Sequence, residues 1–174
     1  MEFEEKTQKV DYIYKGKILN LRKDEIVLPN GEKAFREIVE HNGGCAVLCE
    51  LDGKVVLVKQ FRYPYKEVIW EIPAGKRNLG EDPETTARRE LEEECGLKAG
   101  KMEKIFEVYP SPGYTEEIIH IYRASEVEKA SVHLDEDEFL SSAWFDKETL
   151  KEMIKYKKIK DAKTLIALSY ALGK

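Results

Sequence analysis

Glu90, Glu93 and Glu94 are the residues of this 174-residue sequence whose types and spacing most clearly allow chemistry. On a helix these positions are i, i+3 and i+4, so the three carboxylates lie on one face. Like charges at this spacing repel one another, and the cluster is costly unless a cation binds there. Mg²⁺ suits such a cluster because it takes carboxylate oxygens together with substrate phosphates. The alternative is a solvated, glutamate-rich helix face with no ligand.

The segment that carries these glutamates has the signals of a helix over residues 83–95. Asp82 is a favourable N-cap, and Pro83 suits the first helical position, where its missing N–H costs nothing. Gly96 then follows as the usual stop residue. Apolar residues at i, i+4 and i+8 give the helix a packing face. The glutamates are therefore predicted to stand on a helix with well-defined ends.

The same glutamates belong to a longer pattern that resembles the Nudix box at every fixed position. It runs Gly75, five residues, Glu81, seven residues, and then Arg89, Glu90, Leu91, Glu93, Glu94, Gly96 and Leu97. A chance match of this pattern within the chain is on the order of one in ten million. The resemblance favours the metal site over the solvated helix face, and it implies a Nudix hydrolase.

The resemblance also implies which residues form the metal centre. Glu90 and Glu94 would be the principal ligands of Mg²⁺ or Mn²⁺, with two or more ions in each site. The carbonyl of Ala74, just before the box glycine, would be a backbone ligand. Glu93 would assist directly or through water.

Two further box residues would support this centre. Arg89 would hold a neighbouring glutamate in place rather than touch the substrate. Glu81 would support the metal shell or pair with Arg89. Both residues could equally form plain structural ion pairs.

Length and composition bound the class of protein. A chain of 174 residues and 20.1 kDa indicates one domain, or one domain with a small appendage. No apolar run approaches the ~20 residues of a membrane span and no signal peptide opens the chain, so we expect a cytoplasmic protein without a membrane partner. With a net charge of −5, the chain lacks the excess of positive charge that is typical of nucleic-acid-binding proteins. The three cysteines fit neither a disulfide framework nor a zinc pattern.

Turn signals and strand patterns divide the chain near residue 40. Residues 1–40 are expected to form a small antiparallel β-sheet, and residues 41–174 the main domain. The order of the later elements indicates a mixed α/β fold and fits the α/β/α sandwich that the Nudix resemblance implies. The predicted strands are 10–14, 18–27, 33–40, 45–49, 55–59, 68–72, 102–109, 116–123 and 142–145, and the other predicted helices are 147–156 and 161–172.

Residues 111–116, with the sequence SPGYTE, resemble a loop of the ADP-ribose pyrophosphatase subfamily. Pro112 lies sixteen positions after the box residue Gly96, and Gly113 follows it. The resemblance implies that this loop binds substrate, and binding residues do concentrate on loops. The alternative is a rigid turn that only connects two strands.

Arg62 and Glu71 stand in two further segments that resemble this subfamily, residues 59–63 and 70–75. The guanidinium of Arg62 could bind a phosphate or the terminal ribose through two hydrogen bonds. Glu71 could accept a hydrogen bond from a ribose hydroxyl. Each of them could instead be half of a surface salt bridge.

The N-terminal sheet resembles the dimerisation element of these enzymes, in which strands are exchanged and each site borrows residues from the partner. The resemblance thus implies a homodimer in which Arg36 reaches the neighbouring site. An aromatic side chain such as Tyr12 or Tyr14 could stack on adenine, although ordinary sheet packing explains these tyrosines equally well.

The acidic segment 134–139 contains the candidates for a general base. By itself such a segment is usually a solvated loop. In the enzymes that this chain resembles, the loop closes over the site and its glutamate activates water. Glu136 is our first choice for that glutamate and Glu138 our second.

These observations lead to one expected function and two alternatives. The expected reaction is Mg²⁺-dependent hydrolysis of ADP-ribose, a small-molecule substrate, to AMP and ribose 5-phosphate. The first alternative keeps the enzyme class and changes the substrate to another nucleoside diphosphate sugar or a dinucleoside polyphosphate. The second is a Nudix-like module that binds ADP-ribose as a sensor, which degenerate box glutamates would favour.

Overall fold

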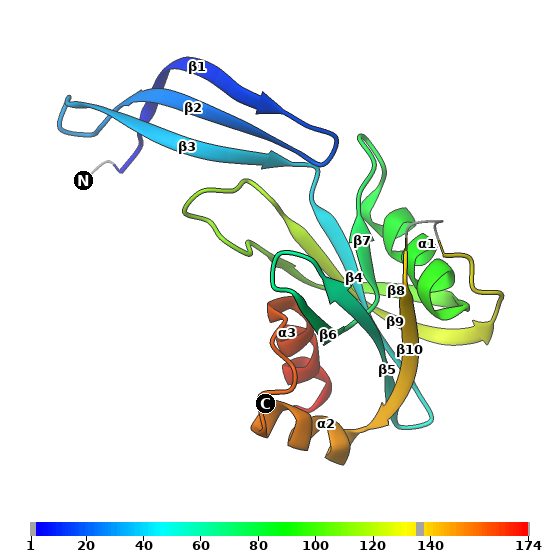
Figure 1. Cartoon of the computed structure of the whole chain (residues 1–174). Helices are drawn as coiled ribbons and strands as arrows, with labels where there is room; N and C mark the ends of the chain where they lie inside the picture. Colours follow the sequence, from blue (N-terminus) through cyan, green and yellow to red (C-terminus); the bar gives the residue numbers. More distant parts are fainter. Residues whose placement is uncertain (1–2, 135–137, 174) are drawn as a thin grey trace. The chain divides into compact units, whose positions relative to one another are not determined.

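The computed structural model describes residues 3–134 and 138–173, and the chain divides into two compact units (Figure 1). One unit contains Met1–Gly43 and Tyr109–Ile118, and the other contains Gly44–Val108 and Ile119–Lys174. Each unit has its own sheet. No helix among the described residues is long and apolar enough to cross a membrane.

The first unit is an antiparallel sheet of strands β1 (Lys6–Lys15), β2 (Leu19–Val27) and β3 (Lys33–His41), in that order. The turn between β2 and β3 follows the predicted hairpin signal. Gly31 there has a positive φ of 87°, and the Asn30 side chain accepts a hydrogen bond from the Glu32 N–H at 3.0 Å. Every residue of β1 is exposed, so this edge strand is covered on neither face within the described chain.

Residues Tyr109–Ile118 complete this unit by pairing with β3. The N–H of Val39 donates to the carbonyl of Tyr114 at 2.7 Å, and Val39 forms a parallel bridge with Thr115. The predicted strand 116–123 is therefore wrong at its start. Because the backbone hydrogen bonds of Tyr114 and Glu116 go to Val39 in β3, the strand β9 begins only at Ile119 and continues to Lys129.

Within the described residues, the second unit contains seven strands in one mixed sheet, with the main order β10-β5-β4-β9-β8. The central strand β4 runs parallel to β9, and the other pairs are antiparallel. A short strand that was not predicted pairs with β4, and it brings the box glycine into the sheet. The strands are β4 (Gly44–Leu51), β5 (Lys54–Arg62), β6 (Glu67–Glu71), β7 (Ala74–Lys76), β8 (Leu97–Val108), β9 (Ile119–Lys129) and β10 (Leu140–Asp146).

Helices lie on both faces of this sheet (Figure 1). Alternate residues of β4 point to opposite faces. Ala46 and Leu48 pack with residues of α2 (Lys147–Lys155) and α3 (Ala162–Ala171), whereas Cys45, Val47 and Cys49 pack with residues of α1 (Pro83–Cys95). The predicted mixed α/β fold with an α/β/α sandwich and a small N-terminal antiparallel sheet is confirmed.

Candidate active site

Helix α1 has the ends that its sequence predicts. The Asp82 side chain accepts a hydrogen bond from the Thr85 N–H at 3.1 Å, and Pro83 is the first helical residue. Gly96 adopts the left-handed conformation, with φ 62° and ψ 43°, and its N–H donates to the carbonyl of Glu92. These caps set the position of the helix along the sheet, and with it the position of the glutamates.

Glu90 and Glu94 are buried residues, at 6% and 3% exposure, and their carboxylates lie against strand β7. The Ala74 N–H donates to Glu94 Oε2 at 2.9 Å. A Cβ at Gly75 would overlap the carboxylate of Glu90, so only glycine allows this close approach. The box glycine and the box glutamates are therefore parts of one packed structure, with the backbone of residues 74–75 beside both carboxylates.

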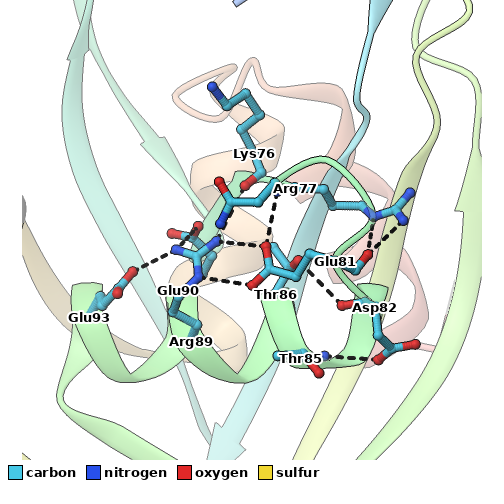
Figure 2. A network of polar contacts seen from close by, with 10 residues as sticks. Lys76, Arg77, Glu81, Asp82, Thr85, Thr86, Arg89, Glu90 and Glu93 are labelled. Atoms are coloured by element: carbon cyan, nitrogen blue, oxygen red, sulfur yellow. Dashed lines mark hydrogen bonds and ion pairs between the residues drawn. The ribbon is translucent and has the colours of Figure 1, made fainter.

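Arg89 connects the polar groups around these carboxylates (Figure 2). Its Nη1 lies 2.7 Å from Glu90 Oε1 and 2.8 Å from Glu93 Oε2. Its Nε lies 3.4 Å from Glu81 Oε1, and its Nη2 donates to the carbonyl of Lys76 at 3.3 Å. A hydrogen bond from the backbone N–H of Asn78 and, to a smaller extent, the contact with Arg89 lower the pKa of Glu81 to about 2. Arg89 thus holds three glutamates in place within this cluster.

Burial raises the pKa of Glu90 to about 7 and that of Glu94 to about 8. Arg89 lowers the pKa of Glu90, and the N–H of Ala74 lowers the pKa of Glu94, but in each case the effect of burial is larger. The charge of Glu138 raises both further, so its carboxylate lies within electrostatic range of the two glutamates. The first-choice base, Glu136, lies outside the described residues.

Arg62 and Glu71 form an ion pair in the second unit, with Arg62 Nε 2.6 Å from Glu71 Oε2. The Glu71 side chain is only 3% exposed, and Lys163 Nζ also pairs with it. The carboxylate that was expected to accept a ribose hydroxyl thus already accepts from two cations. Sequence reasoning missed Lys163, because 92 residues separate it from Glu71 and no local pattern links them.

The other predicted substrate residues lie in the first unit. Arg36 pairs with Glu5, and its Nε donates to Glu5 Oε2 at 2.9 Å. Tyr12 donates to Glu40 Oε1 at 3.0 Å, which is an ordinary sheet contact. Arg36 and the predicted substrate loop line the same groove, which has a volume of about 400 Å³. The residues that line it are Glu5, Arg22, Arg36, Glu37, Ile38, Pro112, Gly113, Tyr114, Thr115 and Glu116.

Comparison with known families shows to which family the chain belongs. Residues 40–168 match the NUDIX domain. The chain belongs to the Nudix family. Residues 5–39, which contain strands β1 and β2 and most of β3, match the N-terminal domain of nucleoside diphosphate sugar hydrolases. The Nudix resemblance predicted from the spacing of the box residues is confirmed.

Individual relatives of this Nudix protein cover nearly its whole length. An ADP-ribose pyrophosphatase of Bacillus subtilis is 45% identical, over 96% of this chain and 92% of the relative. The methanol dehydrogenase activator of Bacillus methanolicus is 44% identical, over 97% of this chain and 92% of the relative. A crystal structure of an ADP compounds hydrolase shares the fold, with a TM-score of 0.84 and 17% identity over 97% of this chain and 92% of that chain.

Nudix hydrolases generally use divalent cations such as Mg²⁺, and the donors present in this site fit a hard cation. Glu90 and Glu94 offer buried carboxylate oxygens whose ionised forms burial disfavours, which a cation would reverse. Among residues 3–134 and 138–173, no three acidic, histidine or cysteine side chains converge as a metal-binding group. Glu90 and Glu93 instead pair with Arg89, and Glu94 accepts a hydrogen bond from the Ala74 N–H.

The pKa values of these two glutamates predict how the stability of the metal-free protein depends on pH. Both values lie above the ordinary 4.5, so their contribution to stability is present at low pH and is lost as pH rises through about 7 and 8. Mg²⁺ competes with protons for the same oxygens. We expect Mg²⁺ to raise Tm by about 5 °C more at pH 8 than at pH 5.5, measured by thermal unfolding with EDTA as reference. Equal shifts at both pH values would contradict this prediction.

Proposed function

We propose that this chain hydrolyses the diphosphate bond of ADP-ribose to give AMP and ribose 5-phosphate. The observation that carries the proposal is the pair of buried carboxylates on α1, packed against Ala74 and Gly75, in a chain with an ADP-ribose pyrophosphatase as a near full-length relative. Phosphoryl chemistry depends mainly on positioning and on neutralising charge. A site built from acids, a cation and an arginine matches that demand.

The proposed metal ligands are Glu90, Glu94 and the carbonyl of Ala74, with Mg²⁺ or Mn²⁺ as the cation and two or more ions in each site. When bound, the cation would neutralise the diphosphate and lower the pKa of a water ligand. Arg89 is proposed to orient Glu90 and Glu93, and its ion pairs with both carboxylates support this role. It is proposed to act on the centre without touching the substrate.

The remaining chemistry is assigned to an arginine and a glutamate. The Nε of Arg62 donates a hydrogen bond to Glu71. Within residues 3–134 and 138–173, its Nη1 and Nη2 form no hydrogen bond. These two nitrogens are proposed to bind a substrate phosphate. A glutamate of segment 134–139, either Glu136 or Glu138, is proposed to accept the proton of the attacking water.

The first unit is proposed to serve substrate binding and assembly. Arg36, Pro112 and Gly113 line one groove, and these residues are proposed to contact the part of the substrate beyond the diphosphate. Strand β1 presents Val10 and Ile13 to solvent, and an exposed edge strand of this kind invites pairing with another chain. We therefore propose a homodimer formed through this sheet, and sedimentation equilibrium measures its mass.

The substrate is tested by comparing kcat/KM with Mg²⁺ for ADP-ribose, ADP-glucose, a dinucleoside polyphosphate and NADH. We expect ADP-ribose to be preferred, with AMP as a product. Preference for another compound would keep the metal site and overturn the substrate. Tight binding of ADP-ribose without hydrolysis of any compound would instead support a sensor.

A second candidate function is the activation of a dehydrogenase, which the relative named methanol dehydrogenase activator favours. Adding the chain to a methanol dehydrogenase with its electron acceptor tests this function. An increase in alcohol oxidation that survives loss of the box carboxylates would separate activation from hydrolysis.

A further inference from the structure

The N-terminus of α3 is joined to the end of strand β6 by buried polar contacts. Asp161 caps the helix, because its Oδ2 accepts from the Thr164 N–H at 2.9 Å and from Thr164 Oγ1 at 2.6 Å. Thr164 Oγ1 in turn accepts from the Ile72 N–H at 2.8 Å. The start of α3 is thereby attached to the backbone that leads through residues 73 and 74 to the carboxylate of Glu94.

Lys163 makes the second attachment, and it leads to an arginine of the proposed site. Its Nζ donates to Glu71 and, at 2.9 Å, to Asp161 Oδ1. Glu71 accepts from Arg62 with its other oxygen. The side chains of Lys163, Glu71 and Arg62 are 12%, 3% and 36% exposed, so Glu71 is the most buried of the three and Arg62 the most exposed. Arg62 stands at the exposed end of a buried chain of charges.

The outer end of this series interacts electrostatically with Glu94, a proposed metal ligand. The charge of Glu94 is among the groups that raise the pKa of Arg62, while burial opposes the rise. Arg62 in turn lowers the pKa of Glu94. The guanidinium therefore lies within electrostatic range of a proposed metal ligand. Glu71, which binds Arg62, is also followed three residues later by Ala74, whose N–H donates to Glu94.

We propose that Lys163 is a positioning residue for the reaction, which it influences through Glu71 and Arg62. This inference rests on the proposed function. Lys163 occupies Glu71 Oε1, so Arg62 binds Glu71 through Oε2 and Nε alone and presents its two terminal nitrogens to the substrate. Without Lys163, the buried carboxylate would recruit a second nitrogen of Arg62, since a charged oxygen deprived of its partner is costly. The guanidinium would then turn away from the phosphate.

The chain offers a matched control. Lys160 pairs with Glu67 at 2.7 Å, and it joins the segment just before α3 to strand β6, to which Lys163 in α3 is also joined. This pair is exposed, with Lys160 at 57%, and exposed ion pairs contribute little. Lys160→Met therefore removes a similar ion pair without touching the series that ends at Arg62.

The experiment is a double-mutant cycle on the full chain with ADP-ribose and Mg²⁺. Lys163→Met is expected to lower kcat/KM by about tenfold or more, chiefly through KM, whereas Lys160→Met stays within about twofold of the parent chain. In an Arg62→Ala background, Lys163→Met should have no further effect. An equal loss in both backgrounds, or no loss in the first, would overturn the proposal. An inactive parent chain would instead refute the proposed function.

A second readout does not depend on activity. In the parent chain the Nε–H of Arg62, identified by its loss in Arg62→Lys, should give a ¹⁵N-resolved signal that Lys163→Met shifts and Lys160→Met leaves in place. Lys163→Met should fold, because Glu71 keeps Arg62 and Asp161 keeps its capping bonds. Circular dichroism checks this, and Lys163→Gln undergoes the same measurements if it does not. An unmoved Arg62 signal in a folded Lys163 variant would overturn the proposal.

Discussion

Glu94→Gln is expected to lower kcat for ADP-ribose hydrolysis by about 10³-fold or more while the fold stays intact. Glutamine has the shape of glutamate, so its side-chain oxygen can still accept from the Ala74 N–H at the distance of 2.9 Å that the parent carboxylate shows. What is lost is the negative charge that a cation requires. A factor of 10³ corresponds to about 4 kcal/mol of transition-state stabilisation.

The stability of Glu94→Gln separates a functional role from a structural one. Burial raises the pKa of Glu94 to about 8, so its ionised form destabilises the metal-free protein above that pH. We expect the metal-free variant to unfold at the same Tm as the parent or a higher one at pH 8. In the parent Mg²⁺ raises Tm, and in the variant this increase should be largely lost.

Glu92→Gln is the matched control for this substitution. Glu92 stands on the same helix but pairs with Lys98 at 3.1 Å, and its side chain is 32% exposed. We expect its kcat to remain within about twofold of the parent, as is usual for a surface substitution. Parent-like turnover by Glu94→Gln, or a loss in Glu92→Gln of similar size, would remove Glu94 from the metal site.

The helix and its carboxylates could be predicted from sequence because their determinants are local. The cap at Asp82, the stop at Gly96 and the spacing of the glutamates all lie within one short segment, and each acts on its own neighbours. The need for glycine at position 75 was visible only as a motif. The structure supplies its physical reason, which is the Glu90 carboxylate that a side chain there would overlap.

Contacts between distant segments could not be predicted from the same patterns. Nothing near Glu71 in the sequence indicates Lys163, and nothing near Thr115 indicates its pairing with Val39 in β3. Strand β7 escaped prediction because its three residues, Ala74–Lys76, are too few for a periodic pattern and include a glycine. In each case the partner that determines the local structure is supplied by the fold.

The general base is the second residue whose substitution should have a large effect, and the described residues give an argument for Glu138. Its charge raises the pKa of both Glu90 and Glu94, and it lies two residues before β10 begins at Leu140. We expect Glu138→Gln to lower kcat by about 10² to 10⁴ with little change in KM, since a base acts on the proton transfer rather than on substrate binding.

Glu136→Gln serves as the counterpart, because the sequence ranks Glu136 first and the acidic segment offers both carboxylates. The two variants can be distinguished by the pH dependence of kcat as well as by its size. At saturating Mg²⁺, where the cation keeps Glu90 and Glu94 ionised, loss of the base should remove the acid limb of the profile, because no base then has to ionise before water attacks the phosphorus. A Glu138→Gln variant that keeps this limb and recovers its rate at high Mg²⁺ would mark Glu138 as a metal ligand. If Glu136→Gln alone loses both the rate and the acid limb, the base is Glu136 and the charge of Glu138 only tunes the two buried glutamates.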